Sequence, residues 1–200
     1  MSSPGETLHG DIDGGWILPT PAARTALHTR SIVCRSFKRD DGLYEIDGRF
    51  IDTRPFEYVS WHRGVCEAGS ALHNMQLRLT LDAERRVQEV VSAMPNTPYG
   101  SCSEVNANFQ RLRGMSIGRG FRQAVRARLG GVEGCTHVLA LLDAMAAAAV
   151  QTFASNANQQ RHAGAAGQAE PVRMWKMDAL IDTCHSYRAD GPLVRQLKGG

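Results

Sequence analysis

Residues 29–53 read TRSIVCRSFKRDDGLYEIDGRFIDT and decide the fold. Two runs rich in β-branched and aromatic residues, Thr29–Lys38 and Leu43–Thr53, flank the turn pair Asp41-Gly42. An Asp-Gly pair between two such runs is a strong hairpin signal, because both residues tolerate the positive φ angles of tight hairpin turns. The stretch therefore predicts two antiparallel strands, and Pro55 ends the second.

Two more strands follow. In Leu72–Leu81, apolar and polar residues alternate, which places Met75, Leu77, Leu79 and Leu81 on one face of a strand. The turn residues 82–84 lead into a fourth strand, Val87–Met94. Residues 56–70 lack such a pattern and are predicted to form a loop.

From Ser101 onward the apolar spacing changes to that of helices. We expect a first helix capped by Ser103 and ended by Gly114, and a third from Cys135 to about Ala154. Between them, a second helix is expected to open at Ser116 or Gly118, to carry Phe121, Val125 and Leu129, and to end at Gly130-Gly131. Strands followed by helices indicate an α+β fold: an antiparallel sheet of about four strands with three helices packed on one face.

The domain organisation predicted from the sequence is simple. Residues 1–24, rich in glycine with few apolar side chains, are expected to be flexible, and residues 25–196 to form a single α+β domain. Within it, residues 154–170 are rich in Asn, Gln, Gly and Ala and are predicted to be an internal linker. The C-terminal segment after this linker should be ordered, because its apolar residues need burial.

Composition narrows the class of protein. Of the 200 residues, 42% are hydrophobic, which suffices for a core, and we find no apolar run of the length that a membrane helix needs. We expect a cytoplasmic protein, since the first residues are polar and do not form a signal peptide. Five cysteines are then expected to be reduced. With a net charge of +3 and no basic block with interleaved aromatics, nucleic acid is not an expected partner.

The first strand pair carries a candidate binding site. Strand alternation places His28, Arg30 and Cys34 on one face, and Asp52 and Arg54 share a face of the returning strand. If these faces meet, they form a pocket in which arginine side chains hold an anionic or phenolic group. The alternative is an Arg–Asp ion pair that fixes the strand ends, with Cys34 as a small core residue.

A second candidate site lies at the start of the third helix. In Gly134-Cys135-Thr136-His137, Cys135 would lie at the positive end of the helix dipole, which favours a thiolate. His73 opens a strand and is expected to reach the same pocket rim. The alternative is a buried cysteine next to a capping Thr136.

Several motifs recur in order, and through them the chain resembles an uncharacterised bacterial domain family, known only as a domain of unknown function and often found in proteobacteria that degrade aromatic compounds. They include His28-Thr29-Arg30, residues 34–42, Asp52-Thr53-Arg54-Pro55, Gly134-Cys135-Thr136-His137 and Asp182-Thr183-Cys184-His185. The resemblance covers residues 25–196. A weaker likeness, from the order of Cys102, Leu112, Gly114 and Cys135, is to the NifU-type iron–sulfur scaffold domain, but that family's early Cys-Gly-Asp motif is missing.

The leading hypothesis is a cofactor-independent lyase or isomerase, of retro-aldol or proton-transfer type, for a small aromatic, oxygenated substrate in bacterial catabolism. The candidate bases are His28, His73 and His137, and the candidate acids are Tyr44 and Tyr99. The substrate would be bound by Arg30, Cys34, Asp52, Arg54 and Cys135. No cofactor and no metal are expected.

Two alternatives stay open. The first is a metal or iron–sulfur carrier that uses Cys102, Cys135 and His137, and the second is a non-catalytic module that binds aromatic ligands. The expected partner is a small molecule, and both a monomer and a homodimer are compatible with the sequence. The sequence leaves open the substrate and the choice among the three histidines.

Overall fold

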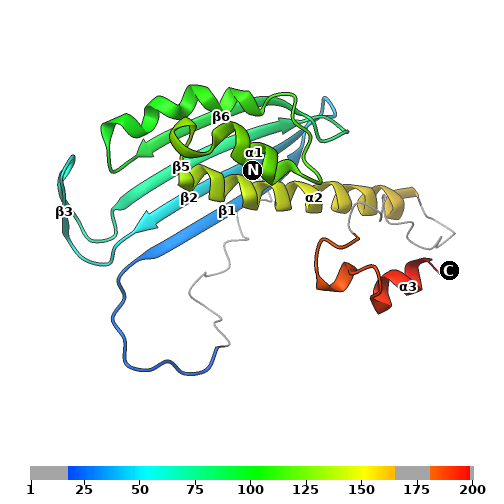
Figure 1. Ribbon diagram of the computed structural model, residues 1–200, viewed down its shortest axis with the longest axis horizontal. Coiled ribbons are helices and arrows are strands. Elements are labelled where there is room, and N and C mark those ends of the chain that lie inside the picture. Colours follow the sequence, from blue (N-terminus) through cyan, green and yellow to red (C-terminus); the bar gives the residue numbers. More distant parts are fainter. Residues whose placement is uncertain (1–17, 165–180, 199–200) are drawn as a thin grey trace, which may run out of the picture.

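The computed structural model describes residues 18–164 and 181–198, and its largest element is a four-stranded antiparallel sheet in the order β1-β2-β5-β6 (Figure 1). The strands are β1 (Thr29–Lys38), β2 (Tyr44–Thr53), β5 (Ala71–Leu81) and β6 (Val87–Asn96). The predicted strands are confirmed to within two residues at each end. The fold belongs to the predicted α+β class, because helices follow the sheet in the chain and pack on it.

The region predicted to be a loop contains a short hairpin. Strands β3 (Tyr58–Ser60) and β4 (Gly64–Cys66) pair with each other and not with the main sheet. The strand pair buries Tyr58 and Cys66 on one side and exposes Val59 and Val65 on the other. Strands of three residues are too short for alternation to be recognised, so the prediction of a loop was wrong here.

The two faces of the main sheet differ as the alternation predicts. Every second residue of β2 is buried, and the buried row consists of Tyr44, Ile46, Gly48, Phe50 and Asp52. The opposite face carries ion pairs such as the one between Arg78 and Asp47. An antiparallel sheet needs cover on only one face, and here all the packed helices lie on that face.

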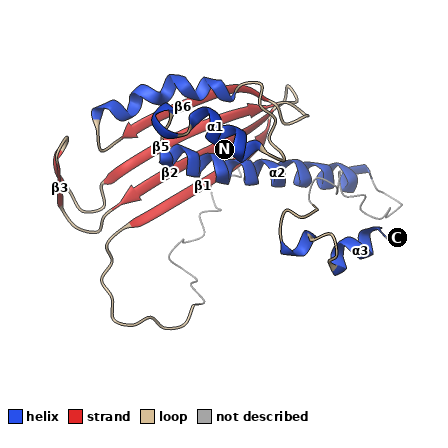
Figure 2. Cartoon of the chain, in the orientation of Figure 1, coloured by secondary structure: helices blue, strands red, loops and turns tan. Residues whose placement is uncertain are grey.

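The helical half consists of η1 (Gly100–Leu112), α1 (Phe121–Leu129), η2 (Gly131–Glu133) and α2 (Thr136–Gly164), shown in blue in Figure 2. The first predicted helix is thus a long 3-10 helix. The third does not end near Ala154: α2 continues to Gly164, through the first part of the predicted linker. Beyond it, η4 (His185–Tyr187) and α3 (Pro192–Lys198) are described. Of residues 1–24, which are predicted to be flexible, residues 1–17 lie outside the described residues, and so does the segment 165–180.

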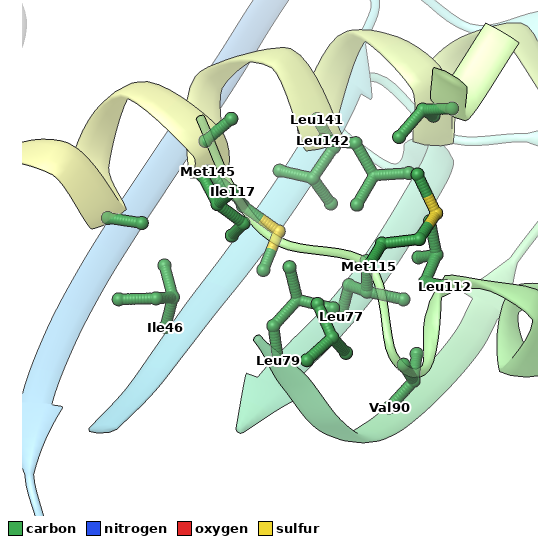
Figure 3. Packing of buried hydrophobic residues seen from close by; sticks show 14 of the residues in the cluster. Ile46, Leu77, Leu79, Val90, Leu112, Met115, Ile117, Leu141, Leu142 and Met145 are labelled. Atoms are coloured by element: carbon green, nitrogen blue, oxygen red, sulfur yellow. The ribbon is translucent and has the colours of Figure 1, made fainter. Parts of the chain in front are cut away.

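Helix α2 lies directly on β1 and β2, and Gly48 makes this close packing feasible. A Cβ atom at position 48 would lie 2.5 Å from Sδ of Met145 and 2.9 Å from Cδ1 of Leu141. Figure 3 shows Met145 and Leu141 reaching from the helix toward the strands, with Ile46 and Leu79 below them. This contact sets how closely α2 approaches the sheet. The helix begins over the end of β2 (Figure 1).

The segment Thr136–Asn156 of α2 is long and apolar enough to cross a membrane by length and composition alone. In the structure, however, three of its larger apolar side chains, Leu141, Leu142 and Met145, are fully buried in the core. The rest of the apolar character comes largely from the alanines of residues 144–149. The core packing of this helix therefore accounts for its composition.

Candidate functional site

The candidate site is centred on Asp52, whose side chain is only 2% exposed. Strand alternation places Asp52 in the same buried row as Phe50, at the end of the sheet where α2 begins. In the strand register, Asp52 lies opposite Arg30 of β1 on one side and opposite His73 of β5 on the other. A carboxylate at this depth needs hydrogen-bond donors, and the two neighbouring strands supply them.

Three side chains lie within hydrogen-bond distance of the Asp52 carboxylate. Arg30 donates from Nε to Oδ1 at 2.8 Å and from Nη2 to Oδ2 at 3.0 Å. Nε2 of His28 lies 3.1 Å from Oδ1, and Nδ1 of His73 lies 3.0 Å from Oδ2. The paired geometry with Arg30 fixes the carboxylate plane. His73 meets it from β5, and His28 from the position just before β1.

The start of α2 adds His137 and Cys135 to this cluster. Nε2 of His137 lies 4.0 Å from Oδ2 of Asp52, and its other ring nitrogen, Nδ1, lies 3.6 Å from Sγ of Cys135. The ring of His137 lies over that of His73, with 3.9 Å between the centroids and an angle of 34° between the planes. Two imidazoles, a carboxylate and a thiol thus converge from three elements of the fold.

Phe50 forms the apolar floor of the site. Its ring is fully buried and meets the ring of His137 edge-on, with 5.2 Å between the centroids. The guanidinium carbon of Arg30 lies 4.6 Å from the centre of the same ring, a cation–π distance. Phe50 therefore supports both His137 and the arginine that holds Asp52.

The surroundings shift the pKa values of three side chains in the cluster. Burial opposes ionisation of Asp52, but the hydrogen bonds from Arg30 and the charges of Arg30 and the histidines outweigh it, and the pKa of this carboxyl is lowered. Burial lowers the pKa of His73, although Asp52 acts in the opposite sense. Burial, followed by the charge of His73, also lowers the pKa of His137. The structure thus favours a carboxylate beside two neutral imidazoles.

The other predicted site residues lie outside this cluster. Tyr44 is buried at the opposite end of β2, where Asn156 donates a hydrogen bond to its hydroxyl. Eight residues of strand, at roughly 3.3 Å each, put it about 26 Å from Asp52. Tyr99 is exposed and precedes η1. Arg54 stacks over the ring of Tyr58 at 4.5 Å, and Cys34 packs against the core beside Gly48.

The cysteines predicted to carry a metal are not brought together. Among the described residues, the group of His, Cys, Asp and Glu side chains that is close enough to hold one ion consists of Asp52, His73 and His137. Cys102 lies at the start of η1 and is not part of this group, so the structure does not bring the predicted set of Cys102, Cys135 and His137 together. Asp52, which the sequence places among the substrate-binding residues, lies at the centre of the cluster and contacts Arg30, His28 and His73.

The fold and the cluster together define an α+β domain with a histidine-rich site around one buried carboxylate, at the end of an open sheet. The chain belongs to a family of proteins of unknown function, DUF2889, whose match spans residues 28–151, more than half of the chain. This confirms the resemblance to a domain of unknown function. The matched span begins at His28 and includes every residue of the cluster. No curated protein and no solved structure matches the chain significantly.

Proposed function

We propose that this domain is a lyase or isomerase that acts by acid–base catalysis on a small, oxygenated, aromatic substrate, with the cluster around Asp52 as its active site. The observation that carries the proposal is that three imidazoles, from His28, His73 and His137, surround one buried carboxylate. Imidazoles are the usual groups for proton transfer near neutral pH, and a fixed carboxylate orients them.

His28 is the base in this proposal. Its side chain is 42% exposed, against 10% for His73 and 24% for His137, so it is the imidazole that a bound substrate reaches most easily. When Nε2 of His28 donates its proton to Oδ1 of Asp52, the lone pair for proton abstraction is on Nδ1. Asp52 then acts as the positioning residue, and Arg30 holds Asp52 in turn.

Proton transfer by His28 is the central step of both proposed reactions. In a retro-aldol cleavage, Nδ1 of His28 accepts the proton of a hydroxyl group, and that oxygen becomes a carbonyl as the carbon–carbon bond breaks. The electron pair of the broken bond passes to the carbon next to a second carbonyl, and the protonated His28 returns the proton there. In an isomerisation, the same base removes a proton from carbon and returns it at a neighbouring position.

Support for an aromatic substrate comes from the site's walls and from the family resemblance. The partly exposed ring of His137 offers a flat surface that suits ring stacking, and the buried ring of Phe50 supports it from below. The arginines predicted to bind the substrate are engaged within the protein, Arg30 with Asp52 and Arg54 with Tyr58. The proposal includes a small-molecule partner and a cytoplasmic location, and the homodimer stays a prediction.

Replacement of His28 by glutamine should lower turnover by about 10²–10⁴-fold, the usual contribution of a general base. The assay follows cleavage of phenolic β-hydroxy ketones, and deuterium exchange into the corresponding phenolic ketones, by proton NMR in D₂O. The matched control is His185→Gln, because His185 is an exposed histidine whose ring contacts Arg188. Equal rates for His28→Gln and the wild type would contradict the assignment. Saturable binding without cleavage or exchange would favour the ligand-binding module instead.

A further inference from the structure

Besides a base, the proposed reaction needs a group that stabilises negative charge on the substrate. Breaking a carbon–carbon bond next to a carbonyl places negative charge on the carbonyl oxygen, and an enzyme must stabilise it with a cation or a hydrogen-bond donor. Both donors of Arg30 that contact the cluster point to Asp52, and Arg54 lies over Tyr58. The two cations expected to face the substrate are therefore engaged with the protein.

The geometry points to a divalent transition-metal ion, of the zinc class, held by Asp52, His73 and His137. Each of the three offers one ligand atom, and these atoms all lie within 4.8 Å of one another. Two ligands bound at about 2.0–2.2 Å and 90–110° apart lie about 2.8–3.6 Å from each other. Oδ2 of Asp52 lies 3.0 Å from Nδ1 of His73, within this range, and 4.0 Å from Nε2 of His137, so the His137 ring must move closer when an ion binds.

The contacts around His137 suit a ligand rather than a hydrogen-bond donor to Asp52. At 4.0 Å, Nε2 of His137 is too far from Oδ2 for a hydrogen bond. Its Nδ1 lies 3.6 Å from Sγ of Cys135, so in the tautomer with the proton on Nδ1 the ring can donate to the sulfur, and the lone pair of Nε2 is available to an ion. Metal-binding histidines generally use their second ring nitrogen for a hydrogen bond of this kind.

The surroundings of Asp52 also match those of a ligand carboxylate. Arg30 contacts both oxygens, and His28 contacts Oδ1, so the oxygen that faces the two imidazoles is Oδ2. These contacts hold the carboxylate in one orientation, as the outer partners of metal ligands do. Two imidazoles and one carboxylate occupy three positions of the ion and leave the others open, which is the arrangement of catalytic metal sites.

This inference rests on the proposed function and gives the three histidines different roles. His73 and His137 hold the ion, which binds the carbonyl oxygen of the substrate, and the more exposed His28 moves the proton. Imidazole and carboxylate ligands suit Zn²⁺, which polarises carbonyl groups without redox chemistry. The protein would then need no organic cofactor.

The test measures metal binding directly and does not depend on turnover. Full-length protein without an affinity tag is stripped with a chelator and titrated with Zn²⁺ alone by calorimetry, and with Co²⁺ by visible absorption. We expect the protein to bind one equivalent of Zn²⁺. With Co²⁺, we expect the visible absorption bands of a protein-bound ion. Loss of an outer partner of a metal ligand typically costs about 10–100-fold in affinity, and His137→Gln, which removes a ligand, should weaken binding by at least that much. His137→Gln is preferred to a change at Asp52 because the side chain of His137 is less buried than that of Asp52. Circular dichroism checks that the variant folds.

The control is again His185→Gln, which should bind Zn²⁺ as the wild type does. Equal affinities for the wild type and His137→Gln, or no stoichiometric binding by the folded wild type, would overturn the metal site. Undiminished turnover after complete removal of metal would overturn the role of the ion and leave the acid–base proposal standing. A further outcome is that removal of the metal abolishes turnover, and that added Zn²⁺ restores it in the wild type but not in His137→Gln. That result would support both the metal site and the acid–base proposal.

Discussion

Replacement of Asp52 by alanine should lower the free energy of unfolding by about 3 kcal/mol, near the lower end of the range for breaking a buried ion pair. The carboxylate is almost completely buried and has close contacts to Arg30, His28 and His73. Without it, the buried imidazole of His73 loses its hydrogen-bond partner. Arg30 is half-exposed and can regain water, which is why we expect the lower end of the range.

Urea unfolding followed by circular dichroism measures this change, and the sheet offers a matched control. Asp47 accepts two hydrogen bonds from Arg78, at 2.6 and 2.7 Å, as Asp52 does from Arg30, but this pair lies on the open face of the sheet. Exposed ion pairs contribute about 0–1 kcal/mol, so Asp47→Ala should change the free energy of unfolding little. Equal losses in the two variants would show that Asp52 is not the buried centre of a cluster.

Replacement of Phe50 by alanine should cost about 3–5 kcal/mol in the free energy of unfolding, as is usual for a large aromatic residue in a core. The ring is fully buried in the row that α2 covers. Its loss leaves a cavity and also removes the surface under Arg30 and His137. We therefore expect Zn²⁺ binding and turnover to weaken in the fraction of protein that stays folded.

The neighbouring strand supplies the control for this prediction. Phe37 lies near the end of β1 and is about half exposed. Phe37→Ala removes the same atoms from the surface of the protein, so its cost should be within roughly 0.5 kcal/mol. Thermal unfolding of both variants measures the difference. A loss of stability in Phe37→Ala as large as that in Phe50→Ala would contradict the packing described here.

Local patterns were sufficient to predict the main sheet and to place Arg30 and Asp52 on neighbouring strands. The alternation in β2 and the Asp41-Gly42 turn give the register in which Arg30 faces Asp52. The same alternation explains why Asp52 is buried, because it continues the row that contains Ile46 and Phe50. Spacing alone also argues against Tyr44, since a residue eight positions away on the same strand is far from Asp52.

The rest of the site depends on contacts between distant segments. His73 meets Asp52 only because residues 54–70 fold into the β3–β4 hairpin and return the chain in register, with an irregularity between Asp52 and Thr53. His137 reaches the cluster because α2 packs on Gly48 through Met145. Neither the length of that hairpin connection nor the docking height of the helix is encoded in a local repeat, so the grouping of Asp52, His73 and His137 was not predictable from spacing.

The most direct test of the central claim, that the cluster around Asp52 is the active site, is a side-chain NMR titration. Protein labelled with ¹⁵N in its histidines is titrated with a phenolic ketone, and the ring nitrogens are followed, because their shifts report tautomer and contacts. We predict that the signals of His28, His73 and His137 change together, while those of His62 and His185 stay constant. Changes confined to His62 or His185 at saturating ligand, with the three cluster histidines unaffected, would contradict the account.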